Sequence, residues 1–393
     1  MTRLPLVLLA LLAAAPASAY PWMVSHGYVS CASCHVDPMG AGQLTTYGRG
    51  MDDLIVRWRV DPAADEAVED GEPNTGLFFG LIAQPAWLNV SGNVRGGGVL
   101  VASPKSTGVY PLVMALDAAV TVDVAPVVAH ATLGYGMRGV GPAVVVSPDA
   151  GADNALVSRE HWLGLKLFDD SLFVRAGRVP LPFGLRNNEH TSFVRDLTRT
   201  DTNLDQQHGV AIAYLSDAVR GEVMAIAGNY QVRPDEVRER GYAATVEIVA
   251  AERLAAGASS LVTYAARDID RGAPLLRQAH GVFARYAPSE ALVILLEADA
   301  LLFSYDSLTH IGGAGWLQLD WAVMPGLHVM PALEIVDTDD PATRPPTAGA
   351  WAGAAWYPLP QTELRVDAVY RAPFLEKVPR GDVAVVAQLH LYF

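Results

Sequence analysis

The chain has two cysteines, and both belong to the motif Cys31-Ala32-Ser33-Cys34-His35. Two thiols at this spacing can bond to the two vinyl groups of one porphyrin, and the histidine that follows can bind its iron. The motif therefore predicts one covalently attached haem c, with Cys31 and Cys34 as thioether residues and His35 as the proximal iron ligand. The alternatives are a redox dithiol, a disulfide or half of a zinc site. A zinc site would need a second cysteine pair, and a redox dithiol would need a βαβ context.

The second axial ligand of the iron has several candidates near the motif. We expect His26 as the candidate distal ligand and Met39 as a weaker alternative, while Met23 and Met51 are also close in sequence. Water or an open position is a further alternative. The choice matters because a methionine ligand raises the reduction potential of a haem.

The first nineteen residues predict export. Arg3 supplies a positive charge, residues 4–15 are an apolar run, and Ala17-Ser18-Ala19 has the small residues of a cleavage site. The run is short for a membrane-spanning helix, which is the alternative interpretation. We therefore expect a signal peptide at 1–19.

The composition is unusual for a soluble protein. The chain is 51% hydrophobic and only 18% charged, yet no later stretch approaches about eighteen uncharged apolar residues. Hydrophobicity spread in this way is typical of a transmembrane β-barrel. A net charge of −14 argues against nucleic acid as a partner, because nucleic-acid binding requires clustered basic residues.

Two further segments follow the signal peptide. Residues 20–75 form the monohaem segment and an acidic, proline-containing linker. Residues 76–393 have the alternating pattern of β-strands. In the last strand, for example, Val383, Val385, Ala387, Leu389, Leu391 and Phe393 all fall on one face.

The spacing of turns predicts how the strands are joined. About sixteen strands alternate between very short turns and longer loops, which is the plan of an outer-membrane barrel with periplasmic turns and extracellular loops. The fold class is therefore all-β, a transmembrane barrel of about sixteen antiparallel strands with a small haem segment that could plug its lumen. A soluble β-sandwich or solenoid is the alternative. The expected strands are 83–95, 112–123, 126–137, 160–168, 171–178, 208–215, 218–230, 241–251, 254–265, 275–287, 290–304, 310–322, 327–337, 347–357, 361–372 and 382–393.

Side chains outside the motif have predicted positions in this barrel. A polar lumen is expected to hold Lys166, Arg175, Glu363, Arg365 and Asp367. The acidic loop 337–340 could attract cations, although such loops are usually only solvated. An interfacial aromatic belt is expected to include Tyr110, Trp162, Tyr214, Tyr286, Tyr305, Trp321, Trp356, Tyr357 and Tyr392.

A known family shows the same arrangement of residues. The shared features are the stretch 25–35 around the cysteines, then Pro38, Gly40, Leu44 and Tyr47-Gly48-Arg49, and the barrel segments 173–178 and 181–186. In these features the chain resembles the fused outer-membrane monohaem cytochrome c–porin family, whose best-known members are Fe(II)-oxidising. The resemblance implies a location in the outer membrane, with the haem segment on the periplasmic side or inside the barrel.

Electron transfer across the outer membrane is the function that these patterns favour. Electrons would pass from an extracellular reductant such as Fe(II), through the haem, to a periplasmic electron-carrier cytochrome, or in the reverse direction. The protein would be an enzyme only in the narrow sense of oxidising a metal ion. The alternatives are a diffusion porin whose haem segment is a plug or gate, and a soluble periplasmic β-protein with a haem sensor. The sequence has no recognisable hydrolase or nucleotide-binding motif.

Overall fold

The computed structural model describes most of the chain after residue 75 and short parts of the region before it. The predicted signal peptide and residues 61–75 of the predicted linker lie outside the described residues. The described residues are 23–26, 31–51, 56, 58, 76–78, 80–104, 106–135, 156–186, 189, 191–202, 205–232, 234–268, 272–305, 308–339, 345–374 and 381–393.

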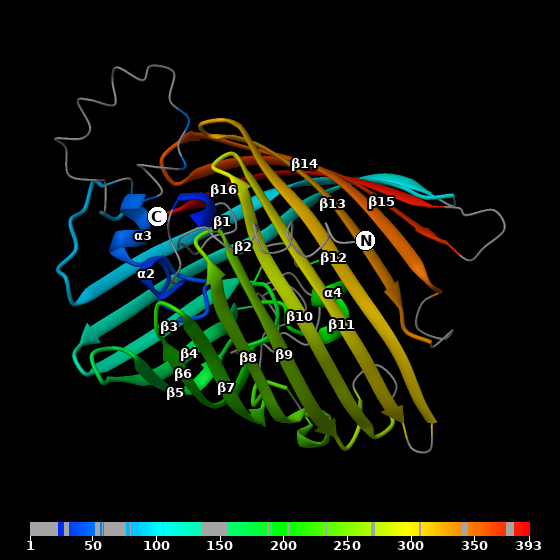
Figure 1. Ribbon diagram of the computed structural model, residues 1–393, viewed down its shortest axis with the longest axis horizontal. Helices are drawn as coiled ribbons and strands as arrows, with labels where there is room; N and C mark the ends of the chain where they lie inside the picture. Colours follow the sequence, from blue (N-terminus) through cyan, green and yellow to red (C-terminus); the bar gives the residue numbers. More distant parts are fainter. Residues whose placement is uncertain are drawn as a thin grey trace, which may run out of the picture.

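Sixteen antiparallel strands form a closed barrel in which each strand pairs with its neighbours in the chain (Figure 1). The last strand closes the wall against the first, with Asn93 opposite Tyr392 and Ala102 opposite Val383. The predicted all-β barrel of sixteen antiparallel strands is thereby confirmed. The strands are β1 (Leu88–Ala102), β2 (Thr107–Val124), β3 (Val127–Tyr135), β4 (Leu156–Leu167), β5 (Leu172–Val179), β6 (Gln207–Leu215), β7 (Val219–Gly228), β8 (Arg240–Ala251), β9 (Leu254–Ala265), β10 (Leu275–Ser289), β11 (Leu292–Tyr305), β12 (Leu308–Met324), β13 (Leu327–Asp337), β14 (Thr347–Leu359), β15 (Thr362–Pro373) and β16 (Asp382–Tyr392).

The two rims of the barrel differ in the length of their connections. The connections after even-numbered strands are two to four residues long. Most connections after odd-numbered strands are longer, and the one between β5 and β6 covers residues 180–206. We call these the short-turn rim and the long-loop rim. β1 begins and β16 ends at the short-turn rim, because the strand number is even.

Side chains alternate between an apolar outer face and a polar lumen. In β15, Leu364, Val366 and Tyr370 are exposed on the outside. The lumen prediction is confirmed for Glu363, Arg365, Asp367 and Arg175, which are all buried. The fifth predicted lumen residue, Lys166, is partly buried and pairs with Asp123 at 2.6 Å. The period-2 pattern of the sequence therefore identified the inner face of the wall correctly.

The β5–β6 loop folds back into the barrel and carries the helix α4 (Phe193–Thr198), as Figure 1 shows. Its charged side chains pair with the inner wall: Arg195 with Glu297 of β11, and Glu189 with Arg365 at 2.6 Å. Backbone amides of the loop also donate to the wall, from Leu185 to the Glu297 carboxylate at 3.0 Å.

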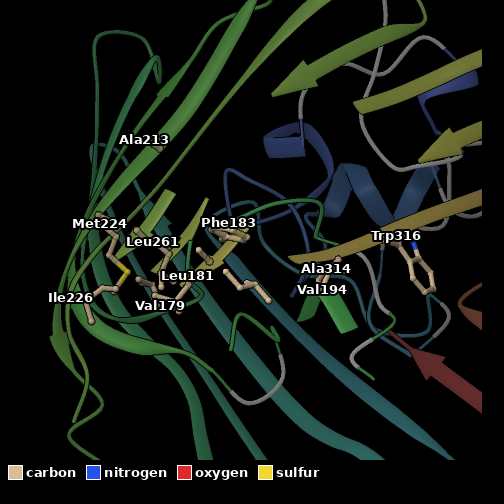
Figure 2. Close-up of a cluster of buried hydrophobic side chains, with 14 of the residues drawn as sticks. Val179, Leu181, Phe183, Val194, Ala213, Met224, Ile226, Leu261, Ala314 and Trp316 are labelled. Carbon is tan, nitrogen blue, oxygen red and sulfur yellow. The ribbon is translucent and has the colours of Figure 1, made fainter. Parts of the chain in front are cut away.

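Apolar side chains fill part of the lumen beside this loop. Phe183 and Val194 of the loop are fully buried and belong to the same cluster as Leu261 and Trp316 of the wall (Figure 2). The loop and the wall therefore share a hydrophobic core in addition to their ion pairs, so the loop is a fixed part of the lumen.

Several details of the prediction were wrong. The first strand runs from Leu88 to Ala102, whereas 83–95 was expected, because the run of glycines at 96–98 continues the strand instead of ending it.

Trp162 does not belong to an outer aromatic belt. It is buried on the inner face, where it stacks on His130 with ring centroids 5.0 Å apart and lies beneath Arg175. Four other predicted belt residues are exposed on the outside: Tyr214, Tyr286, Trp321 and Trp356. Tyr110 is also exposed, but it lies opposite Val99 on the lumen face of the wall.

The short helices before the barrel are η1 (Met23–His26), α2 (Cys31–Cys34) and α3 (Thr46–Met51), and a further 3₁₀ turn, η4 (Asp235–Val237), lies between β7 and β8. In the part of the chain that the structure describes, no helix is long and apolar enough to cross a membrane.

Candidate functional site

The cysteine motif forms one helical turn, α2, which packs tightly against α3. His35 continues the turn by donating its backbone N–H to the Cys31 carbonyl at 2.9 Å, and Thr45 donates to the Cys34 carbonyl at 2.9 Å. A Cβ atom at position 48 would lie 2.3 Å from the same Cys34 carbonyl oxygen. The two helices can therefore approach this closely because residue 48 is glycine.

A tight loop connects His35 to α3. The Val36 N–H donates to the Gln43 carbonyl at 2.9 Å, which closes the base of the loop. At its tip, Gly40 donates to the Asp37 carbonyl at 3.0 Å and has φ of +92°, a conformation that favours glycine. The Met39 N–H donates to the Asp37 carboxylate at 2.8 Å. The loop is thus held by its own backbone as well as by the barrel.

One side of the motif segment is bound to the wall where β1 begins. The Asn89 amide donates to the Leu44 carbonyl at 2.8 Å, and Arg49 donates to the Asn89 amide oxygen at 2.7 Å. The Thr121 hydroxyl of β2 donates to the Gln43 amide oxygen at 2.5 Å. These contacts place the segment inside the barrel, close to the short-turn rim (Figure 1).

The other side of the segment is bound deeper in the lumen. The Asp37 carboxylate lies 2.8 Å from Arg175 of β5 and 2.9 Å from Arg186 of the β5–β6 loop. Arg186 also donates to the Gly40 carbonyl at 3.2 Å. Burial alone would raise the pKa of Asp37, but the two guanidinium groups outweigh it and hold the pKa well below its usual range. Asp37 is therefore an anion that joins the segment to both the wall and the loop.

Cys31, Cys34 and His35 all line one cavity between this segment and the inner wall. Both thiols are buried and form no disulfide. The His35 Nδ1 atom is buried without a hydrogen-bond partner among the described residues. Burial also lowers the pKa of His35 to about 4, so that the imidazole is neutral at neutral pH, the form that binds a metal. The structure thus brings the three predicted haem residues together.

The remaining candidate ligands are distributed differently. Met23 and Met39 line the same cavity, whereas His26 is exposed and is not part of the lining. Met51, at the end of α3, is also outside the lining. None of these placements tests iron ligation, so the distal ligand stays a prediction.

Charged residues of the wall, the β5–β6 loop and α3 also line the cavity. They are five arginines and three carboxylates: Arg49, Arg95, Arg159, Arg186 and Arg285, with Asp117, Glu160 and Glu363. Arg285 also lies beside the Cys31 thiol. The alternation of β1, β4 and β10 marks Arg95, Arg159 and Arg285 as inward-facing, but no sequence signal indicates that they meet at the motif.

The chemistry of the lining fits a haem. A haem needs apolar contacts for its two faces, positive groups for its propionates, and nitrogen or sulfur ligands for its iron. The cavity offers Leu44, Leu185 and Leu295 as apolar contacts, and the arginines and His35 for the other requirements. In the described part of the chain, no three His, Cys, Asp or Glu side chains form a cluster suited to a bare metal ion. Asp340, in the acidic loop considered for cations, lies outside the described residues.

Comparison with solved structures shows which fold this is. An anion-selective porin from Comamonas acidovorans superposes with a TM-score of 0.59 at 12% identity, over 78% of this chain and 99% of that one. OmpT of Vibrio cholerae gives 0.57 at 10% identity, over 78% and 97%. The outer-membrane channel DcaP of Acinetobacter baumannii gives 0.52 at 13% identity, again over 78% and 97%. Neither a described protein family nor a curated protein matches the chain.

The chain therefore has the fold of a porin-like outer-membrane β-barrel. Sequence identities this low establish the fold alone. None of the three proteins is described as a cytochrome or a haem protein. The haem segment remains a prediction from the sequence motif.

Proposed function

We propose that this protein is an outer-membrane barrel that transfers electrons through one haem c held in its lumen. The observation that carries the proposal is the convergence of Cys31, Cys34 and His35 on a single cavity inside the barrel. A motif match alone is weak, but this one occurs where a porphyrin would be enclosed by a rigid wall.

The location in the outer membrane is supported by the outer face of the barrel. Apolar side chains such as Val366 and Leu333 are exposed there, where a soluble protein would have polar ones. The short-turn rim then faces the periplasm and the long-loop rim faces the cell exterior. Lipid is the partner that this face requires.

The residues of the cavity have distinct roles in this proposal. Cys31 and Cys34 would form the two thioether bonds, His35 would bind the iron, and the cavity arginines would receive the propionates. When bound, the haem supplies an iron that takes up and releases one electron. Asp37, Arg175 and Arg186 hold the segment at a fixed depth in the barrel.

The position of the segment bears on the path of the electrons. One haem cannot reach across a hydrocarbon core of about 30 Å from a site outside the membrane. A site inside the lumen shortens the distance to the long-loop rim. The donor would be an extracellular reductant such as Fe(II), and the acceptor a periplasmic electron carrier, with the reverse direction using the same residues.

A diffusion porin whose lumen contains a plug is the second candidate, and the comparisons support it more directly. The similar structures include an anion-selective porin and a channel. Here residues 31–51 would restrict the lumen near the short-turn rim. The β5–β6 loop would restrict it from the long-loop rim. This candidate predicts measurable ion conductance and no dependence of function on a haem.

Two measurements on the full-length protein in detergent separate the candidates. Haem that remains on the chain after denaturing electrophoresis in the wild type, but is lost in the Cys31→Ala, Cys34→Ala double variant, would support electron transfer. Reduction of that haem by Fe(II) would then support iron as the donor. A wild type that conducts ions in planar bilayers and carries no covalent haem would establish the porin and exclude electron transfer through a haem.

A further inference from the structure

The cavity contains more potential iron ligands than the single histidine of the motif. Besides the two cysteines and His35, the lining includes three side chains with a nitrogen or sulfur donor suited to iron: Met23, Met39 and His390. The distal ligand must belong to a different part of the chain from the tight loop that carries His35, because it binds the opposite face of the porphyrin. This requirement distinguishes the three.

His390 already uses both ring nitrogens in contacts with the wall. Its Nδ1 atom lies 3.0 Å from the Glu363 carboxylate and its Nε2 atom lies 2.9 Å from the Asn93 amide oxygen. Both ring nitrogens are thus engaged in the β1, β15 and β16 region of the barrel. Ligation would break one of these hydrogen bonds and leave a buried polar group without its partner.

The backbone conformation keeps Met39 close to the proximal ligand His35. It lies four residues after His35, within the turn that the Gly40 N–H closes on the Asp37 carbonyl at 3.0 Å. Its own N–H is bound to the Asp37 carboxylate, which two arginines hold in place. Four residues could pass around a porphyrin edge only in an extended conformation, which this turn excludes.

Met23 meets the requirement. It comes from η1, which lies before the motif and contacts β10 and β11. Its side chain is only 6% exposed and lines the cavity with Leu295 of β11. His26 belongs to the same 3₁₀ turn but is exposed and outside the lining.

We propose that Met23 is the distal ligand of the haem iron, an inference that rests on the proposed function. The thioether sulfur of methionine is neutral and stabilises ferrous over ferric iron, so it raises the reduction potential. A haem with His35 and Met23 as ligands is therefore suited to accept electrons from a high-potential donor, which is the property that Fe(II) oxidation requires.

The test is the optical spectrum and reduction potential of the full-length, haem-loaded protein in detergent. Methionine ligation gives ferric haem a weak sulfur-to-iron charge-transfer band at the red end of its spectrum. We expect this band in the wild type. In Met23→Leu we expect it to disappear and the potential to fall, while the covalently bound haem stays at the wild-type level. The band should persist in Met39→Leu. The band and the potential should both be unchanged in His26→Gln, because His26 lies outside the lining.

Met23→His is a second variant that tests the proposal even if Met23→Leu misfolds, because it keeps a ligand at this position. It should keep a low-spin spectrum without the charge-transfer band and have a lower potential. Retention of the band in Met23→Leu, its loss in Met39→Leu, or its absence from the wild type would overturn Met23 as ligand. A wild type without covalent haem would be a different result, since it would remove the proposed function itself.

Discussion

Asp37 and Arg186 lie 2.9 Å apart in the lumen, and they join two segments that enter the barrel from opposite rims. Asp37 belongs to the motif segment, which is bound near the short-turn rim, and Arg186 belongs to the β5–β6 loop of the long-loop rim. Both side chains are almost completely buried. The cysteine motif therefore depends for its position on a loop that the sequence places far away from it.

This pair predicts a strong effect of Asp37→Asn. The variant leaves the buried guanidinium groups of Arg175 and Arg186 with Glu222 but without Asp37, so that one positive charge is uncompensated, at a cost of about 3–5 kcal/mol to the docking of the segment. Hydrogen exchange at the Val36 and Gly40 amides should become faster. The matched control is Lys166→Gln, which breaks a more exposed ion pair worth about 0–1 kcal/mol. Equal exchange rates in Asp37→Asn and the wild type would contradict the prediction.

Gly48→Ala should disturb the cysteine motif without altering its chemistry. The added methyl group would lie 2.3 Å from the Cys34 carbonyl oxygen, so α2 and α3 must separate. We expect faster labelling of Cys31 and Cys34 by a maleimide in the haem-free protein, and less covalent haem in the loaded one. Gly98→Ala is the control, because its nearest contact would be an ordinary 3.5 Å. Labelling at the same rate in both variants would refute the proposed steric role.

Phe183→Ala should loosen the β5–β6 loop. Phe183 is 1% exposed and packs in the apolar cluster of the lumen, where loss of an aromatic side chain costs about 3–5 kcal/mol. Limited proteolysis should cut within 180–206, and ion conductance in planar bilayers should rise. Leu333→Ala removes an exposed side chain from the outer wall and should change neither. If Phe183→Ala also changes neither, packing of the Phe183 ring is not what holds the loop.

The outer face can be tested by inserting charge at two depths. Val366 lies in the middle of β15, and Val323 lies at the short-turn end of β12; both are exposed. In phospholipid vesicles, Val366→Arg should lower the free energy of unfolding by about 2–4 kcal/mol and Val323→Arg by about 0–1 kcal/mol. The measurement is reversible unfolding in urea. Similar costs at both positions would argue against a membrane around this wall.

The sequence predicted the wall far better than the contents of the lumen. Alternation along β15 distinguished Glu363 and Arg365 from Leu364 and Val366, because each strand follows the period of two independently of its neighbours. Turn spacing likewise predicted both rims. Some exceptions were local. β1 continues through glycines 96–98, beyond the expected end at residue 95, and Trp162 faces the lumen, because aromatic residues near strand ends occur on both faces of the wall.

The candidate site was only half predictable. Cys31, Cys34 and His35 form a contiguous motif whose spacing carries its own chemical meaning. Arg95, Arg159 and Arg285 reach the same cavity from three strands, and their meeting depends on barrel closure and on the depth of the segment. Met23 was one of several nearby candidates until burial separated it from the exposed His26.

The route of the chain into and out of the lumen has a topological consequence. On the way in, η1 packs beside β10 and β11, and His26 lies near Arg253 of the β8–β9 turn and Glu290 of the β10–β11 turn. On the way out, Trp58 donates its N–H to the Tyr357 carbonyl at 2.7 Å, beside the turn at Gly326. Both passages are at the same rim, so the described residues between them, 31–51, enter and leave the barrel from one side. The cylinder can consequently be completed before this segment enters it.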